Sequence, residues 1–158
     1  MFENNIRYAR EELEMTQKEL GYIFGVSDSA VRLWETAHDS IPFNKLIKFC
    51  NMFDYSLDFV CGLTRRNIKY GKFKTDKTKI SKKLKKLRTE LKITQQVLTD
   101  ECKISQTTYS GYETGHYLIS TTNLYYICKT YNISMDWIVG RTNNMYINSS
   151  KKKKNRNT

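Results

Sequence analysis

Two pairs of glutamate and histidine are the first candidates for chemistry in this sequence. Glu35 and His38 lie in the string WETAH, and Glu113 and His116 lie in the string YETGH. A carboxylate beside an imidazole is a combination used in general acid–base catalysis, and both groups bind metals. The recurrence indicates either two sites or one structural element that occurs twice.

Other residues for metal binding or covalent catalysis are sparse. The chain has two histidines in all, and no C-x-x-C pair occurs among its four cysteines, which are Cys50, Cys61, Cys102 and Cys128. Isolated cysteines of this kind are typical of buried, reduced thiols in an intracellular protein. We expect no metal, no cofactor and no enzymatic activity.

An internal repeat accounts for the recurrence. Shifting the chain by 78 residues aligns the segment from about 6 to 66 with the segment up to 144 without a gap, so that His38 falls on His116. An ungapped match of this length indicates two copies of one unit. We therefore interpret WETAH and YETGH as one position of a duplicated scaffold, where a histidine can favour the negative end of a helix.

Each copy reads as five short helices. In the first copy, apolar residues recur at helical spacing over 4–13 and 17–24, and further helices are expected to about residue 35, over 42–53 and at 57–61. Thr16 and Ser27 are placed to cap the second and third of these helices. No alternating strand pattern competes over a comparable length. The predicted fold class is all-α, with two tandem five-helix domains.

The net charge of +11 is unevenly distributed. Residues 1–66 contain 8 Lys and Arg against 10 Asp and Glu, whereas 67–83 contain 7 against 1 and 145–158 contain 5 against none. Such segments favour a polyanionic partner, most often nucleic acid, although solubilising linkers and tails share this composition. We predict a first domain at 1–66, a basic linker at 67–81, a second domain at 82–144 and a basic, disordered tail at 145–158.

Membrane and secretory signals are not found in the sequence. No apolar run approaches the roughly 20 residues of a membrane-spanning helix, and the first residues are too acidic for a secretory signal. We expect a cytoplasmic protein. The Lys- and Asn-rich composition is associated with AT-rich bacterial or phage genomes.

Specific motifs in both copies match one family. The strings TQKELGYIFGVSDSAVRLWE and TQQVLTDECKISQTTYSGYE resemble the lambda-repressor-like (Cro/Xre) helix–turn–helix regulators. The strings YSLDFVCGLT and ISMDWIVGRT resemble the closing helix of that family. The resemblance implies a transcriptional regulator, expected to be a repressor, that binds double-stranded DNA by inserting the third helix of each domain into the major groove.

The resemblance also implies residue roles. Gln17 and Gln95 match a glutamine that contacts a backbone phosphate. Arg10 with Glu35, and Arg88 with Glu113, match a structural ion pair between the first and third helices. The implied DNA-contacting positions around the third helices are Ser27, Asp28, Ser29, Arg32 and Leu33, and Ser105, Gln106, Thr107, Ser110 and Gly111. Lys82, Lys83 and Lys86, on the first helix of the second copy, are expected near the DNA backbone.

The two copies differ at these positions. Gln106 is suited to adenine and Thr107 to a thymine methyl group, whereas Gly111 supplies no contact and weakens a helix. In the first copy Arg32 is suited to guanine, but Asp28 stands where a phosphate or base would approach. The first copy is therefore either a DNA reader or a pairing surface for another subunit.

A protein-binding module is the alternative function. The second copy is rich in tyrosine, which is common at interfaces. On this alternative the chain resembles an antitoxin: one copy forms a homodimer or binds a protein partner, such as a toxin or another regulator. The two functions overlap, because many antitoxins bind DNA through the same fold.

Overall fold

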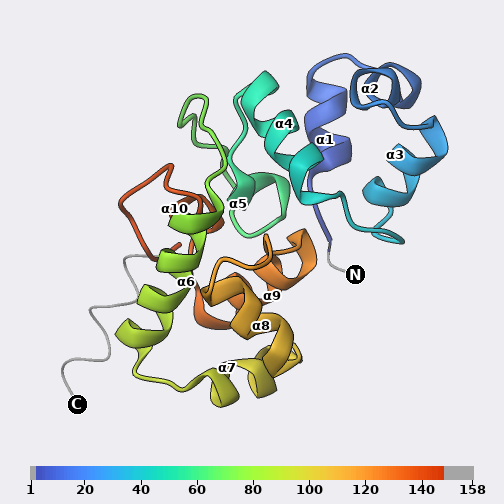
Figure 1. The fold of residues 1–158 in the computed structure, drawn as a ribbon. Coiled ribbons are helices and arrows are strands. Elements are labelled where there is room, and N and C mark those ends of the chain that lie inside the picture. Colours follow the sequence, from blue (N-terminus) through green and yellow to red (C-terminus); the bar gives the residue numbers. More distant parts are fainter. Residues whose placement is uncertain (1–2, 148–158) are drawn as a thin grey trace. The chain divides into compact units, whose positions relative to one another are not determined.

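The computed structural model describes residues 3–147, which form helices and no extended strand (Figure 1). The described residues divide into two compact units, one made of residues 3–74 and 119–122 and the other of residues 75–118 and 123–147. The helices of the first unit are α1 (Ile6–Glu12), α2 (Gln17–Phe24), α3 (Asp28–Glu35), α4 (Phe43–Phe53) and α5 (Leu57–Val60). Those of the second are α6 (Lys77–Leu91), α7 (Gln95–Cys102), α8 (Gln106–Glu113), α9 (Thr121–Tyr131) and α10 (Met135–Ile138). The predicted all-α fold is confirmed.

The helix pair α2 and α3 is set by local signals in the sequence. The Thr16 side chain accepts a hydrogen bond from the Glu19 amide, and the Glu19 carboxylate accepts one from the Thr16 amide at 2.7 Å. This reciprocal capping satisfies donors that the first turn leaves open. Gly25, in the left-handed region at φ 64°, ends α2, and the Ser27 side chain then caps α3.

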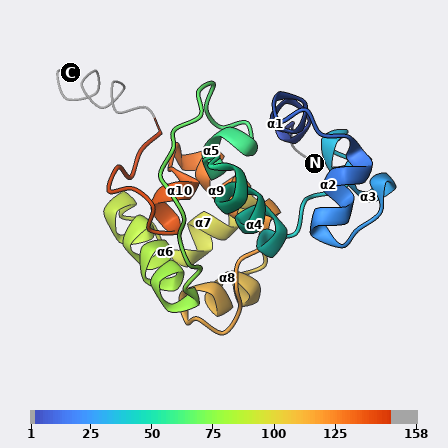
Figure 2. The same ribbon diagram turned by 90° about the horizontal axis from the view of Figure 1, so that it is seen from above.

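The turn between α2 and α3 depends on close backbone packing. A Cβ atom added at Gly21 would lie 2.7 Å from the Val26 carbonyl oxygen, closer than real Cβ contacts. The absence of a side chain at Gly21 therefore lets the turn fold back on α2. The two helices lie side by side, with α3 following directly after the turn (Figures 1 and 2).

Each unit has an apolar core behind its third helix. In the first unit, Val31 is fully buried and Trp34 is 3% exposed. In the second, Tyr109 is fully buried and Tyr112 nearly so. All four side chains point inward and belong to the core.

The structure differs from the predicted linker at 67–81. Asn67 accepts a hydrogen bond from the Ser56 amide, and the Phe73 amide donates to Asn51, so this part of the segment packs on the first unit. From Lys77 onward the chain is already in α6, capped by Asp76. Ile80 is buried, so the first turns of α6, before the predicted domain start at 82, contribute an apolar side chain to the core. The many lysines around Ile80 made this part of the sequence resemble a linker.

The second unit ends with a similar contact. The Met145 carbonyl oxygen accepts a hydrogen bond from the Ser134 amide, and the Ile147 amide donates to the Asn132 carbonyl. Ser134 corresponds in the repeat to Ser56, so this segment occupies the place of Asn67. The ordered unit thus extends beyond the predicted boundary at 144. The remainder of the predicted tail, residues 148–158, lies outside the described residues.

Between residues 3 and 147 no helix combines the length and the apolar character needed to cross a membrane.

Candidate nucleic-acid interface

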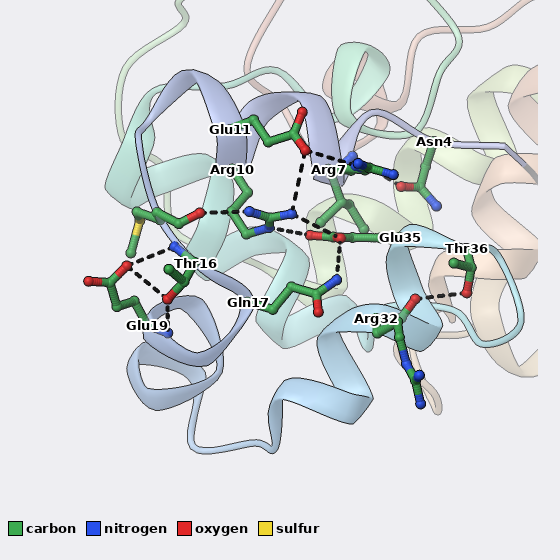
Figure 3. A network of polar contacts seen from close by, with 12 residues as sticks. Asn4, Arg7, Arg10, Glu11, Thr16, Gln17, Glu19, Arg32, Glu35 and Thr36 are labelled. Carbon is green, nitrogen blue, oxygen red and sulfur yellow. Dashed lines mark hydrogen bonds and ion pairs between the residues drawn. The ribbon is translucent and has the colours of Figure 1, made fainter.

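In the first unit one carboxylate joins three helices. Arg10 on α1 donates from Nε to Glu35 Oε1 at 2.5 Å and from Nη2 to Oε2 at 3.2 Å. Gln17, the first residue of α2, donates from Nε2 to the same Oε2 at 2.8 Å. The Arg10 Nη1 atom donates to the Met15 carbonyl at 2.6 Å (Figure 3). We call Arg10, Gln17 and Glu35 the first cluster.

The second unit repeats this geometry. Arg88 donates from Nε to Glu113 Oε1 at 2.7 Å and from Nη2 to Oε2 at 3.2 Å, and Gln95 donates to Oε2 at 2.9 Å. The Arg88 Nη1 atom also donates to the Ile93 carbonyl. We call Arg88, Gln95 and Glu113 the second cluster. In both clusters the glutamate side chain is nearly inaccessible to solvent.

The second cluster holds its charges firmly. Burial raises the pKa of Glu113, but hydrogen bonds from Arg88 and Gln95 outweigh burial and leave this pKa below its ordinary value. The hydrogen bond to Glu113 raises the pKa of Arg88 despite opposing burial. Both groups are therefore charged at neutral pH, and the ion pair that orients α8 is fully formed.

Gln17 and Gln95 have a structural role within the clusters. Each amide nitrogen already donates one hydrogen bond to a glutamate. A side-chain amide has two N–H donors, so one remains for the phosphate contact that the family resemblance implies. Each glutamine thus first fixes the third helix relative to the second.

The first unit exposes one face of α3. The predicted DNA-contacting residues Asp28, Ser29, Arg32 and Leu33 are all exposed, and Leu33 retains 40% of its surface. Figure 3 shows the Arg32 side chain pointing away from the first cluster. The Ser27 hydroxyl accepts a hydrogen bond from the Ala30 amide, so Ser27 begins the helix at the edge of this face.

The second unit exposes the matching face of α8 with one exception. Gln106 and Thr107 are exposed and Ser110 is half-buried, while Ser105 caps the helix. Gly111 is buried, because the ring of Tyr117 lies against it. Its predicted place on the open face is therefore wrong.

Tyr117 is the residue of this face that sequence reasoning did not assign. The feature of the sequence that could have indicated Tyr117 is Gly111, which stands where the first copy has Leu33. A missing side chain on an exposed helix face indicates a neighbour that needs the space.

The three predicted lysines of α6 differ in their surroundings. Lys82 and Lys86 are exposed. Lys83 is half-buried, and its Nζ atom lies 4.4 Å from the centre of the Trp137 ring. Burial, followed by the charge of Lys86, lowers the pKa of Lys83. The ammonium group of Lys83 therefore packs on the closing helix α10, whereas Lys82 and Lys86 remain open to solvent.

The two histidines, His38 and His116, are exposed and lie just beyond the third helices. His38 Nδ1 is 3.0 Å from the Thr36 hydroxyl, and the His116 ring packs edge-on against Tyr117. No group of three or more metal-binding side chains occurs among residues 3–147. The four cysteines are buried and form no disulfide.

Comparison with known proteins gives one family. A helix-turn-helix family model (HTH_3) matches the chain twice, at residues 6–60 and 84–138. No curated protein and no solved structure matches the chain. Each match falls on one copy of the repeat and includes the cluster of that copy.

Replacing Glu113 tests the second cluster. We expect Glu113→Gln to lower the free energy of unfolding of the second unit by about 3 kcal/mol at neutral pH, because Arg88 loses its counter-charge in a partly buried site. The pKa of Glu113 is lowered on folding, so its stabilisation is present above about pH 4.3 and is lost as the pH falls through the folded value. The difference from wild type should therefore shrink in acid.

The measurement is urea unfolding followed by Trp137 fluorescence in a Trp34→Phe background, from about pH 6 to about pH 3. The exposed Glu90 on the same unit is the control, and Glu90→Ala should change the free energy by about 0.5 kcal/mol or less. A Glu113→Gln effect that is equally small, or that is constant across this pH range, contradicts the role of the ion pair.

Proposed function

The chain belongs to the helix-turn-helix family of Xre-type DNA-binding regulators, and from this premise we propose that it is a sequence-specific repressor that inserts α3 and α8 into the major groove of double-stranded DNA. One observation carries the proposal. In each unit a buried cluster fixes the third helix by its inner side, and the opposite side presents polar side chains to solvent. Its proposed site of action is the cytoplasm, where bacterial and phage DNA lie.

The second unit has the features expected of the domain that binds DNA more tightly. Gln106 can form a bidentate pair with adenine, and Thr107 can contact a thymine methyl group. The exposed lysines Lys82, Lys85 and Lys86 extend along α6 and supply charge for phosphate contacts. Its preference is expected to be for A·T pairs.

The first unit presents different chemistry. Arg32 suits guanine O6 and N7, and Asp28 can accept a hydrogen bond from cytosine N4. The segment 1–66 has more acidic than basic residues, so sequence-independent attraction to phosphates is weak there. The first unit therefore depends on base contacts more than the second does.

A second function is favoured for the first unit by Leu33. This apolar side chain is 40% exposed on the same helix as the acidic Asp28, which suits a protein surface as well as a DNA groove. On this alternative α3 pairs two copies of the chain or binds a protein partner such as a toxin, and α8 alone reads DNA.

DNA binding itself is tested by salt dependence. We expect the protein to bind random duplex DNA and to lose about tenfold or more of its affinity between about 50 and 200 mM salt, because several counterions are released from phosphates. The measurement is fluorescence anisotropy of a labelled duplex. Absence of binding at the lower salt concentration contradicts the proposed function.

The roles of the two units are separated with single variants on an operator selected from random DNA. We expect Gln106→Ala and Arg32→Ala each to weaken operator binding by about 1–3 kcal/mol, because each removes a bidentate base contact. Thr130→Ala, at an exposed position on α9, is the control and should bind as the wild type does.

If Arg32→Ala leaves operator affinity unchanged but alters the oligomeric state, the first unit is a pairing surface. If Gln106→Ala has no effect while Arg32→Ala weakens binding, the assignment of the second unit as the stronger reader is wrong.

A further inference from the structure

The exposed face of α8 contains an aromatic ring that comes from beyond the helix. A Cβ atom added at Gly111 would lie 2.2 Å from Tyr117 Cδ2 and 2.6 Å from Cε2, so the ring occupies the space that a side chain at this position would fill. The Tyr117 side chain is nevertheless 56% exposed. One surface of the ring packs on α8 and the rest is open to solvent.

The backbone fixes Tyr117 in this place. The amides of His116 and Tyr117 both donate to the Gly111 carbonyl, at 2.9 and 3.1 Å. The His116 ring packs edge-on against the Tyr117 ring with centroids 5.8 Å apart. The tyrosine is thus held beside the helix before any partner binds, which reduces the entropy lost on binding.

The first unit has the same turn after its third helix, but there the larger apolar side chain is on the helix and not in the turn. The amides of His38 and Asp39 donate to the Leu33 carbonyl, at 3.0 and 3.1 Å. There the large side chain is Leu33 on the helix, and the residue that corresponds to Tyr117 is Asp39. The Tyr117 ring therefore replaces the apolar side chain that Leu33 supplies at this position of α3.

This exchange explains why a glycine, which destabilises a helix, occurs at position 111 within α8. Glycine within a helix lowers helix stability relative to alanine, and Gly111 has no positive φ that would require it. Contact with the Tyr117 ring is what the missing side chain permits.

We propose that Tyr117 is a base-reading residue of the second unit, which contacts a thymine methyl group in the major groove. The inference rests on the proposed DNA-binding function. Gly111 lies one turn after Thr107 on the same helix face, so the ring extends the reading face along α8. The thymine methyl is the apolar group that base edges present in the major groove, and an open apolar ring surface suits it.

Uracil substitution tests the contact. On the operator selected with wild-type protein, each thymine is replaced in turn by deoxyuridine, which lacks the methyl group. We expect wild-type affinity to fall about fourfold at one position outside the contact of Thr107, the value for one buried methyl group. Tyr117→Ala should bind more weakly and lose this sensitivity, whereas Tyr117→Phe should retain it because it keeps the ring.

Tyr22→Ala is the matched control, since Tyr22 is 88% exposed on α2 and should leave the whole pattern unchanged. The proposal is overturned if Tyr117→Ala, with circular dichroism like that of the wild type, keeps the same deoxyuridine sensitivity. A changed oligomeric state with unchanged sensitivity also overturns it, and assigns the ring to a subunit contact.

These outcomes are separate from failure of the proposed function. If wild type and all three variants bind duplex DNA with the expected salt dependence, the function stands and the deoxyuridine pattern alone decides the role of Tyr117. If the wild type binds no DNA at low salt, the function and this inference fall together.

Discussion

In each unit a single glutamate carboxylate accepts hydrogen bonds from an arginine of the first helix and a glutamine of the second. The Arg10 guanidinium meets Glu35 with two nitrogens, and Arg88 meets Glu113 in the same way. A paired guanidinium and carboxylate restrict direction as well as distance. The third helix can therefore take one orientation, and the outward direction of its exposed face follows from this contact.

The constraint separates two kinds of position. Residues that turn toward the cluster and the core must remain compatible with a buried ion pair and close packing. Residues on the opposite side have no such requirement, and it is there that Asp28, Ser29 and Arg32 differ from Gln106, Thr107 and Ser110. One scaffold thus carries two chemically different faces.

The sequence predicted what depends on short-range patterns and on the repeat. The caps at Thr16 and Ser27 follow from residue type and spacing, and the matching of Glu35 with Glu113 pointed to a structural role. Contacts between distant segments were not predictable in this way. A lysine is expected to be exposed whatever its neighbours in the sequence, yet Lys83 packs on Trp137. The basic composition of 67–81 predicted a linker, although α6 already begins at Lys77. The sequence shows Gly111 only as a position without a side chain, whereas in the fold the Tyr117 ring, six residues away, fills that space.

In the proposed function the clusters provide a constant scaffold, and the exposed face alone determines which bases are read. Transferring the second face to the first unit (Asp28→Gln, Ser29→Thr, Arg32→Ser, Leu33→Gly and Asp39→Tyr) and selecting operators from random duplex DNA tests it most directly. We expect the wild type to select two different half-sites and the folded variant to select the half-site of the second unit twice. Selection of unchanged sequences by the folded variant would contradict it.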